Sequence, residues 1–247
     1  KVAGAHARPG FLTILDRLAT FWEGREEDAI EQADRIMEAI ATYDTSVIEG
    51  SGKPNPELLD AWFERMHKNL DRVHGGFTEQ GPKFPPHTTL RLMLLEARNE
   101  FALEMAAFKK AAEENDSPED EEDVFEPSGG PAWFALRTTL DAMARGGIYD
   151  HVGGGFHRYS TDGKWFAPHF EKMLSDNAQL ASIYADAYRL AKDPEHGRMA
   201  RSVVQWILRE LKDEDEGFHS AVDADSEGEE GKYYVWTAAE ILDILGS

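Results

Sequence analysis

The sequence predicts a mostly α protein built from stacked helical hairpins, with short β-hairpins in its loops. Apolar residues recur at helical spacing along most of the chain. Three loops pair glycine with an aromatic residue, and each is followed by a helical stretch: Gly75-Gly76-Phe77, Gly153-Gly154-Gly155-Phe156 and Glu216-Gly217-Phe218. Their spacing is too wide for one helix and suits a helical hairpin plus a long loop. We therefore expect a repeated hairpin unit whose loops build a site on one face.

Helices are predicted where the apolar period is helical and a breaker follows. Asn55 is a natural N-cap with Pro56 at the first helical position. Thr237 and Glu240 form a capping box for a last helix, which stops at Gly246. The predicted helices span about 11–18, 29–40, 55–74, 88–111, 131–144, 170–191, 195–211 and 237–246.

Two short β segments are predicted among the loops. Phe156 to Ser160 suits a short strand because it follows a glycine-rich stretch and precedes another loop. The segment from Gly217 to Trp236 predicts a hairpin, in which residues 218–222 pair with 232–236 across an acidic turn.

The composition excludes several classes of partner. Net charge is −21, which a nucleic acid or an anionic membrane would repel. No apolar run approaches the roughly 18 residues of a membrane span. We therefore predict no nucleic-acid and no membrane partner. The chain does not start with Met and shows no signal-peptide pattern, so we expect a fragment of a cytoplasmic protein.

The absence of cysteine limits the chemistry further. With no cysteine there are no disulfides, thiolate metal sites or cysteine nucleophiles. No spacing fits a zinc site such as HExxH. We predict no metal and no cofactor.

The acid excess is partly concentrated in one run. Residues 113–123 carry mostly Asp and Glu, and like charges this dense resist folding, so a flexible surface loop is predicted. Asp and Glu outnumber Lys and Arg 47 to 26, so a salt-adapted source is an alternative reading of the composition to an ordinary solvated surface.

The densest polar constellation surrounds the predicted start of the helix at residue 170. His169 and Glu171 fall at that start, where an imidazole and a carboxylate suit general acid–base work. Lys172 and Asp176 are four apart on one helix face, and Asn177 lies on the neighbouring face. The alternative is structural: Glu171 stabilises the helix dipole, His169 caps the helix, and Lys172–Asp176 is a surface pair.

A second group lies among the preceding glycines. Asp150, His151, Arg158, Tyr159 and Trp165 combine rings with polar groups, which suits a sugar: rings stack on its apolar face and polar groups fix its hydroxyls. The alternative is a buried structural network in which Arg158 pairs with a carboxylate.

A third group is acidic. Asp223, Asp225 and Glu227 begin like a calcium loop, but Tyr234 stands where the closing bidentate Glu is needed, which argues against an EF-hand. Either these acids form a solvated turn, or they form an acidic wall facing the same pocket as Glu171.

Taken together, four strings of residues identify a family resemblance. They are Gly75-Gly76-Phe77 with Pro82-Lys83-Phe84-Pro85, then 147–160, then Pro168-His169-Phe170-Glu171-Lys172-Met173-Leu174 with 176–180, and finally 223–232. From about residue 8 onward, the chain resembles the thioredoxin-like proteins related to spermatogenesis-associated protein 20.

The resemblance implies a fold and a division into domains. Family members carry a thioredoxin-like domain followed by a helical toroid of the six-hairpin glycosidase type. It implies that residues 1–45 are a helical tail after a missing thioredoxin-like domain. Residues 46–247 would be the N-terminal half of an (α/α)6 toroid. An open toroid exposes apolar surface, so self-association through that edge is expected.

The function predicted is binding of a sugar or sugar derivative on the loop face. If the domain is an enzyme, His169 and Glu171 are its acid–base candidates, for epimerisation or glycoside hydrolysis. The alternative is a non-catalytic structural or partner-binding module of a thioredoxin-like protein.

Overall fold

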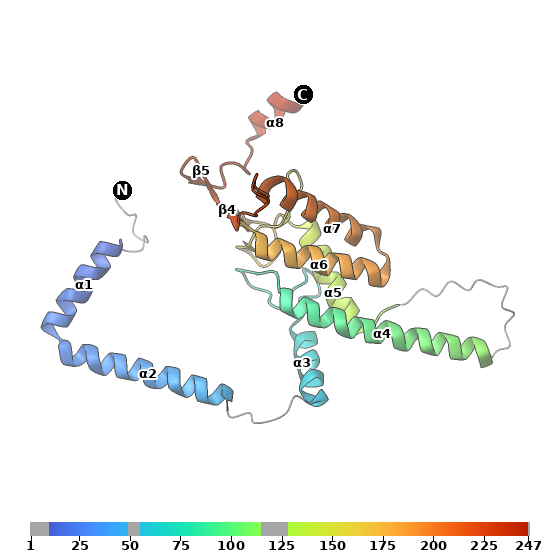
Figure 1. The fold of residues 1–247 in the computed structure, drawn as a ribbon, viewed down its shortest axis with the longest axis horizontal. Helices are drawn as coiled ribbons and strands as arrows, with labels where there is room; N and C mark the ends of the chain where they lie inside the picture. The colour runs from blue at the N-terminus through green and yellow to red at the C-terminus, as the bar shows by residue number, and fades with distance from the viewer. Residues whose placement is uncertain (1–9, 49–54, 115–127, 247) are drawn as a thin grey trace. The chain divides into compact units, whose positions relative to one another are not determined.

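A computed structural model describes residues 10–48, 55–114 and 128–246 of the chain (Figure 1). The chain divides into two compact units, Lys1–Leu58 and Leu59–Ser247. The predicted acidic loop at 113–123 lies outside the described residues, apart from its first two positions, which end a helix.

The first unit contains two consecutive helices. α1 (Phe11–Gly24) and α2 (Glu26–Ile48) are separated at Arg25, whose N–H caps α1 by donating to the carbonyl of Phe21 at 2.8 Å. Both helices extend beyond the predicted apolar stretches. No residue of α1 is buried, although its apolar residues recur at helical spacing.

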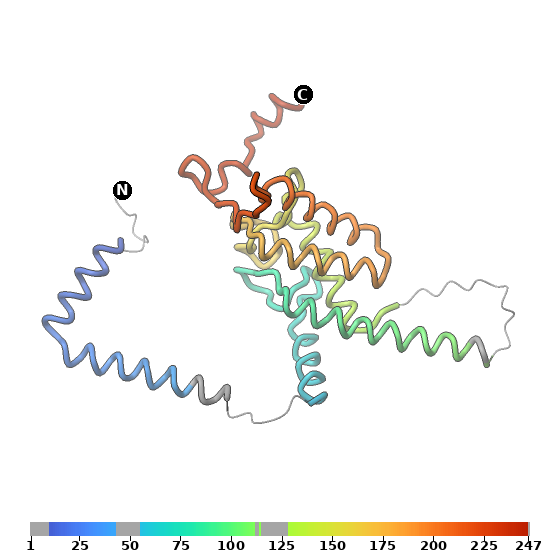
Figure 2. The backbone as a smooth tube through the Cα atoms, in the orientation of Figure 1, coloured from blue at the N-terminus to red at the C-terminus, as the bar shows by residue number. Residues whose placement is uncertain are grey.

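The second unit holds the core and all the predicted site residues. In this unit α4 packs against α5 and α6, and α6 packs against α7 (Figures 1 and 2). The helices are α3 (Pro56–Asn69), α4 (His87–Glu114), α5 (Pro131–Arg145), α6 (Leu174–Ala191), α7 (Pro194–Trp206) with a π turn at Ile207–Leu211, and α8 (Ala238–Leu245).

Local sequence fixes several of these helix ends. Asp193 caps α7 by accepting from the N–H of Glu195 at 2.9 Å, with Pro194 in the first turn. The predicted capping box of Thr237 and Glu240 is present at α8, and its two reciprocal hydrogen bonds satisfy backbone donors that a helix start leaves free.

Apolar side chains from the helices and from the loops meet in one core. Leu136, Leu140, Leu180 and Tyr184 come from α5 and α6, and Phe156 comes from the second glycine-rich loop. All are fully buried. The first two glycine-aromatic loops are therefore anchored to the core by Phe77 and Phe156, whereas Phe218 of the third loop is 44% exposed.

Three pairs of very short antiparallel strands join these loops. β1 (Tyr159–Ser160) pairs with β2 (Pro168–His169), β3 (Lys172–Met173) with β4 (Ala221–Val222), and β5 (Asp225–Ser226) with β6 (Glu229–Glu230). The predicted strand at 156–160 is present only in its last two residues.

The predicted pairing of 218–222 with 232–236 is wrong. Instead, β4 pairs with β3, and the acidic turn itself forms the tight hairpin β5–β6. Glu227 (φ 52°) and Gly228 (φ 80°) are both left-handed, which is the backbone that a two-residue hairpin loop requires.

The predicted helix start at residue 170 is also wrong. α6 begins at Leu174 because Pro168–His169 and Lys172–Met173 are extended and hydrogen-bonded to other strands. His169 and Glu171 therefore precede the helix. The predicted Lys172–Asp176 pair is absent, because Lys172 turns to Asp150 instead.

The predicted class is confirmed: the described chain is mostly α, built from helical hairpins such as α4–α5 and α6–α7, with short β pairs in the loops. Across the described residues, no helix is both long enough and apolar enough to span a membrane.

Candidate functional site

Two of the glycine-aromatic loops share one backbone design. Each opens with an aspartate, Asp71 or Asp150, whose Oδ1 accepts the N–H groups of the residues two and three positions later. Each aspartate also exchanges backbone hydrogen bonds with glycines at the end of its own loop. Gly75 and Gly76, like Gly154 and Gly155, have positive φ, which explains why glycine is needed there.

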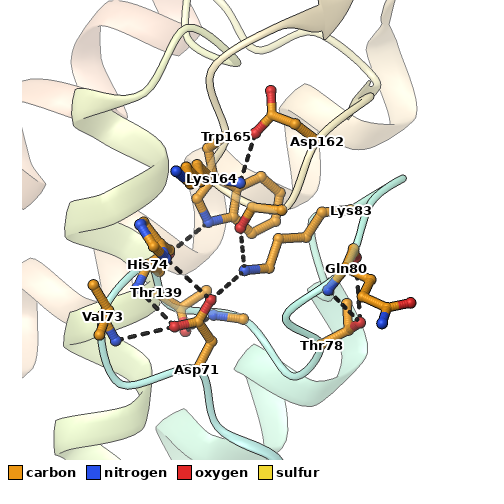
Figure 3. Close-up of polar contacts among 12 residues, drawn as sticks. Asp71, Val73, His74, Thr78, Gln80, Lys83, Thr139, Asp162, Lys164 and Trp165 are labelled. Carbon is orange, nitrogen blue, oxygen red and sulfur yellow. Dashed lines mark hydrogen bonds and ion pairs between the residues drawn. The ribbon is translucent and has the colours of Figure 1, made fainter.

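A buried lysine closes each of these loops. Lys83 Nζ donates to Asp71 Oδ2 at 3.0 Å and to the carbonyl of Gly163 at 2.8 Å (Figure 3). Lys172 Nζ donates to Asp150 Oδ2 at 2.7 Å and to the carbonyl of Gly154 at 2.8 Å. Both lysine side chains are only 1% exposed.

Aromatic rings complete both lysine sites. Lys83 Nζ lies 5.1 Å from the ring centroid of Trp165, and Lys172 Nζ lies 5.2 Å from Trp206 and 4.9 Å from Tyr234. Cation–π attraction and the ion pair together offset the cost of burying the ammonium. We call Asp71–Lys83 and Asp150–Lys172 the two loop clamps.

In each clamp, the lysine and backbone N–H groups keep the aspartate in its charged form. Burial acts to raise the pKa of Asp150, but the hydrogen bonds from Lys172 and from the N–H of Gly153 outweigh it and hold the pKa below its usual value. The pKa of Asp71 is lowered in the same way, with Lys83 and the N–H of His74 opposing burial. Asp150 is thus a charged structural anchor for its loop.

A different cluster, with more exposed side chains, lies beside β1 and β2. Phe84, Tyr159 and His169 form a stack: the ring centroids of Phe84 and Tyr159 are 4.6 Å apart, and those of Tyr159 and His169 are 4.9 Å apart. His169 Nδ1 lies 2.7 Å from Glu230 Oε1. Phe84 is 52% exposed, so the stack presents an open ring face.

One carboxylate stands next to this ring stack, and a second interacts with the first through its charge. Glu171 Oε2 accepts from Arg158 Nη1 at 3.0 Å and lies 4.0 Å from His169 Nε2. Asp176, in the first turn of α6, is partly buried. Burial raises the pKa of Asp176, and the Glu171 charge raises it further, while His87 and Arg158 oppose the shift.

His87, at the start of α4, faces Asp176. Burial lowers its pKa, and the charge of Asp176 opposes that shift. Among the described residues, its Nε2 is one of two buried side-chain nitrogen atoms with no hydrogen-bond partner. We name Phe84, His87, Arg158, Tyr159, His169, Glu171, Asp176 and Glu230 the loop-face cluster.

The remaining predicted acids gather elsewhere. Asp150, Asp223 and Asp225 line a cavity of about 390 Å³, together with Lys172, Trp206 and Tyr234. Neither His169 nor Glu171 is among the residues that line it. The structure thus places the predicted residues in two neighbouring groups around the β5–β6 hairpin.

The other predicted ligand residues already have protein partners. Trp165 is fully buried and donates from Nε1 to the carbonyl of His74 at 2.7 Å. Asn177 is fully buried and bonds both the N–H and the carbonyl of Phe156. His151 Nε2 contacts the carbonyl of Gly146, and the exposed Glu227 pairs with Lys232. A ligand role for these residues stays a prediction.

Three members of the cluster were not predicted as site residues from the sequence: Phe84, His87 and Glu230. Phe84 and His87 flank the two prolines after the first glycine-aromatic loop, where a stiff extended segment leads into α4. A phenyl ring and an imidazole next to such a stiff segment could have indicated site residues from the sequence. For Glu230 there was no signal, because its position depends on the β5–β6 hairpin. Among the described residues, no group of three or more His or acidic residues is placed to hold a metal ion.

A buried histidine next to the second clamp makes stability depend on pH. His157 is 2% exposed, and its Nδ1 donates to the carbonyl of Phe170 at 3.0 Å. Burial, helped by the charge of Lys172, lowers its pKa from 6.5 to about 4. The neutral form is therefore favoured in the folded state.

We expect the free energy of unfolding to fall as the pH is lowered from about 6.5 to about 4. In that window the unfolded chain binds a proton at residue 157 that the folded chain does not, so about 3 kcal/mol present above pH 6.5 is lost. Urea unfolding at several pH values, followed by circular dichroism, measures this. His157→Gln should flatten that part of the curve. An equal slope in the variant would show that other groups cause it.

No protein-family model matches the chain. It is 35% identical to human spermatogenesis-associated protein 20 and 34% identical to the mouse protein of that name, in each case over 246 residues, 96% of this chain. The chain spans 28% of the length of these relatives. A solved structure of a sugar epimerase from a ruminal bacterium overlays 66% of this chain and 40% of its own, with a TM-score of 0.43 at 13% identity.

Proposed function

The chain is homologous over 96% of its length to a segment of the spermatogenesis-associated protein 20 proteins, whose name states no activity; from the site itself, we propose that the loop-face cluster binds a sugar or sugar derivative and performs acid–base chemistry on it. The observation that carries the proposal is Asp176. It is a partly buried carboxyl whose pKa is raised by burial and by the charge of Glu171, and Glu171 in turn lies 4.0 Å from the imidazole of His169 in the ring stack.

The rings supply the apolar half of sugar recognition. Phe84, Tyr159 and His169 stack face to face, and the half-exposed Phe84 offers an open ring for the C–H face of a pyranose. The polar half comes from Arg158, Glu171 and Glu230, whose side chains are 42%, 26% and 55% exposed. A ligand can therefore reach their oxygen and nitrogen atoms without unfolding the loops.

The two carboxyl groups sit in different environments, as acid–base pairs in enzymes do. Asp176, with its raised pKa, is the candidate proton donor. Glu171, held by Arg158, and the imidazole of His169 are the candidate proton acceptors. This assignment supports either epimerisation, by removal and return of a proton on carbon, or hydrolysis of a glycosidic bond.

The test uses the chain with a panel of glucose, mannose, N-acetylglucosamine and maltose. Calorimetry measures binding, and incorporation of solvent deuterium into the sugar measures proton exchange on carbon. Aryl glycosides report hydrolysis. Asp176→Asn should lower any measured rate by about 10²–10⁴-fold with little effect on affinity, because it removes the proton but keeps the shape.

Glu195→Gln is the matched control, because Glu195 is an exposed acid on α7 whose partner is the neighbouring Arg198. It should leave binding and rate unchanged. If none of the sugars binds the unaltered chain, or if both variants behave alike, the proposal fails.

A second candidate function has its own support. Both loop clamps are buried and each joins its lysine to an aspartate of the protein, which favours a structural or partner-binding module whose motifs hold its loops. Under this reading Asp176→Asn raises stability by relieving a desolvated carboxyl, and no sugar binds. The same measurements therefore separate the two functions.

A further inference from the structure

A large basic cavity lies apart from the loop-face cluster. It has a volume of about 840 Å³ and runs along α5, between the loop after α3 and the 146–166 loops. Three fixed cations line it, Arg137, Arg145 and Lys164, against one carboxylate, Asp141. In a chain with 47 acidic and 26 basic side chains, this local reversal of charge stands out.

The two arginines remain available for a ligand. Arg137 Nε and Arg145 Nη2 each lie 3.7 Å from Asp141 Oδ2, which is longer than a hydrogen bond. Asp141 instead bonds the buried His196, whose Nε2 lies 3.1 Å from its Oδ1. The arginine side chains are 56% and 82% exposed, and in the described part of the chain neither donates a hydrogen bond to protein.

The third cation is held in place by its loop. The carboxylate of Asp162 accepts the N–H groups of Lys164, Phe166 and Ala167 at 2.6, 3.3 and 2.7 Å. Trp165 is buried against Lys83 and has a left-handed backbone (φ 63°) (Figure 3). Its neighbours Lys164 and Phe166 are exposed. Phe166 is 78% exposed at the cavity wall.

We propose that this cavity binds a phosphate monoester that carries an aromatic group. Three cations and one carboxylate leave two positive charges, which match a dianionic phosphate. Guanidinium groups bind phosphate oxygens through paired N–H donors, and the exposed ring of Phe166 covers the aromatic part. The cavity volume is in the range of small-molecule sites.

The helix itself does not provide this site. The cavity follows α5 to its C-terminal end, where the helix dipole disfavours an anion. Binding must therefore come from the three side chains, which makes the proposal sensitive to their removal.

The experiment titrates the chain with phenyl phosphate by calorimetry, with inorganic phosphate and phenol as separate probes. We expect phenyl phosphate to bind more tightly than either probe, and more weakly as salt is added. Arg137→Gln combined with Arg145→Gln should weaken it at least about tenfold, because charged hydrogen bonds to the phosphate are lost. Both side chains are exposed, so thermal unfolding should stay close to that of the parent.

Arg198→Gln is the matched control, because Arg198 lies on α7 and its side chain is 54% exposed. It should bind phenyl phosphate like the parent. No binding by the parent, or equal loss in the control, would overturn the proposal. Inorganic phosphate binding as tightly as phenyl phosphate would overturn the role given to Phe166. Sugar binding at the loop-face cluster does not enter these measurements.

Discussion

Lys172→Met is expected to destabilise the second unit by about 3–5 kcal/mol, because it leaves a buried aspartate without its counter-charge. Asp150 is only 13% exposed, and Lys172 is its one charged hydrogen-bond partner among the described residues. Methionine keeps an unbranched side chain, one atom shorter, between Trp206 and Tyr234, so most of the loss reports the charge rather than packing. Urea unfolding followed by circular dichroism measures the change.

A double-mutant cycle isolates the clamp. Asp150→Asn keeps an oxygen that can accept the N–H groups of Val152 and Gly153. The free energy of unfolding lost by the double variant should therefore be smaller, by about 1–3 kcal/mol, than the sum of the losses of the two single variants. Lys68→Met, at an exposed position on α3, should cost less than about 0.5 kcal/mol. Additive losses at 150 and 172 would mean that the two residues do not act together.

The second large effect is expected for Gly75→Ala. Gly75 has φ +68°, and a Cβ there would lie 2.6 Å from the Cα of Thr139 and 2.8 Å from the carbonyl oxygen of Thr138, both backbone atoms of α5. The left-handed conformation costs about 1–2 kcal/mol for a residue with a side chain, and the overlap about 1–3 more. Loss of about 2–5 kcal/mol in the free energy of unfolding is therefore expected.

Gly228→Ala separates the two causes. Gly228 has φ +80°, but nothing lies within 4 Å of its added Cβ. This variant should lose only the conformational part, about 1–2 kcal/mol. If Gly75→Ala costs no more than Gly228→Ala, then the first loop can move away from α5 and the close approach is not required.

Much of the fold was predictable because helices depend on local signals. The capping box at Thr237 and the proline after Asn55 act within one turn, and the apolar period needs only its own segment. The mostly α class and the presence of the helices followed from these signals.

The strands and the site were less predictable, because their partners are distant in sequence. The four-residue spacing predicts Lys172 and Asp176 on one helix face, where Asp176 is the nearest local partner. The pairing of β3 with β4 keeps Lys172 extended and directs it to Asp150. The same pairing moves His169 and Glu171 out of the helix.

The sequence by itself determined the helical class and showed the glycine-aromatic loops and most of the candidate acids and imidazoles as strings. Only the tertiary structure decided which charges are used internally and which face outward. Asp150 and Asp176 are the same residue type, yet the first is held charged by Lys172 and the second is desolvated beside Glu171. The physical reason is that a carboxyl's pKa depends on burial and on charges brought near by folding, and neither is encoded locally.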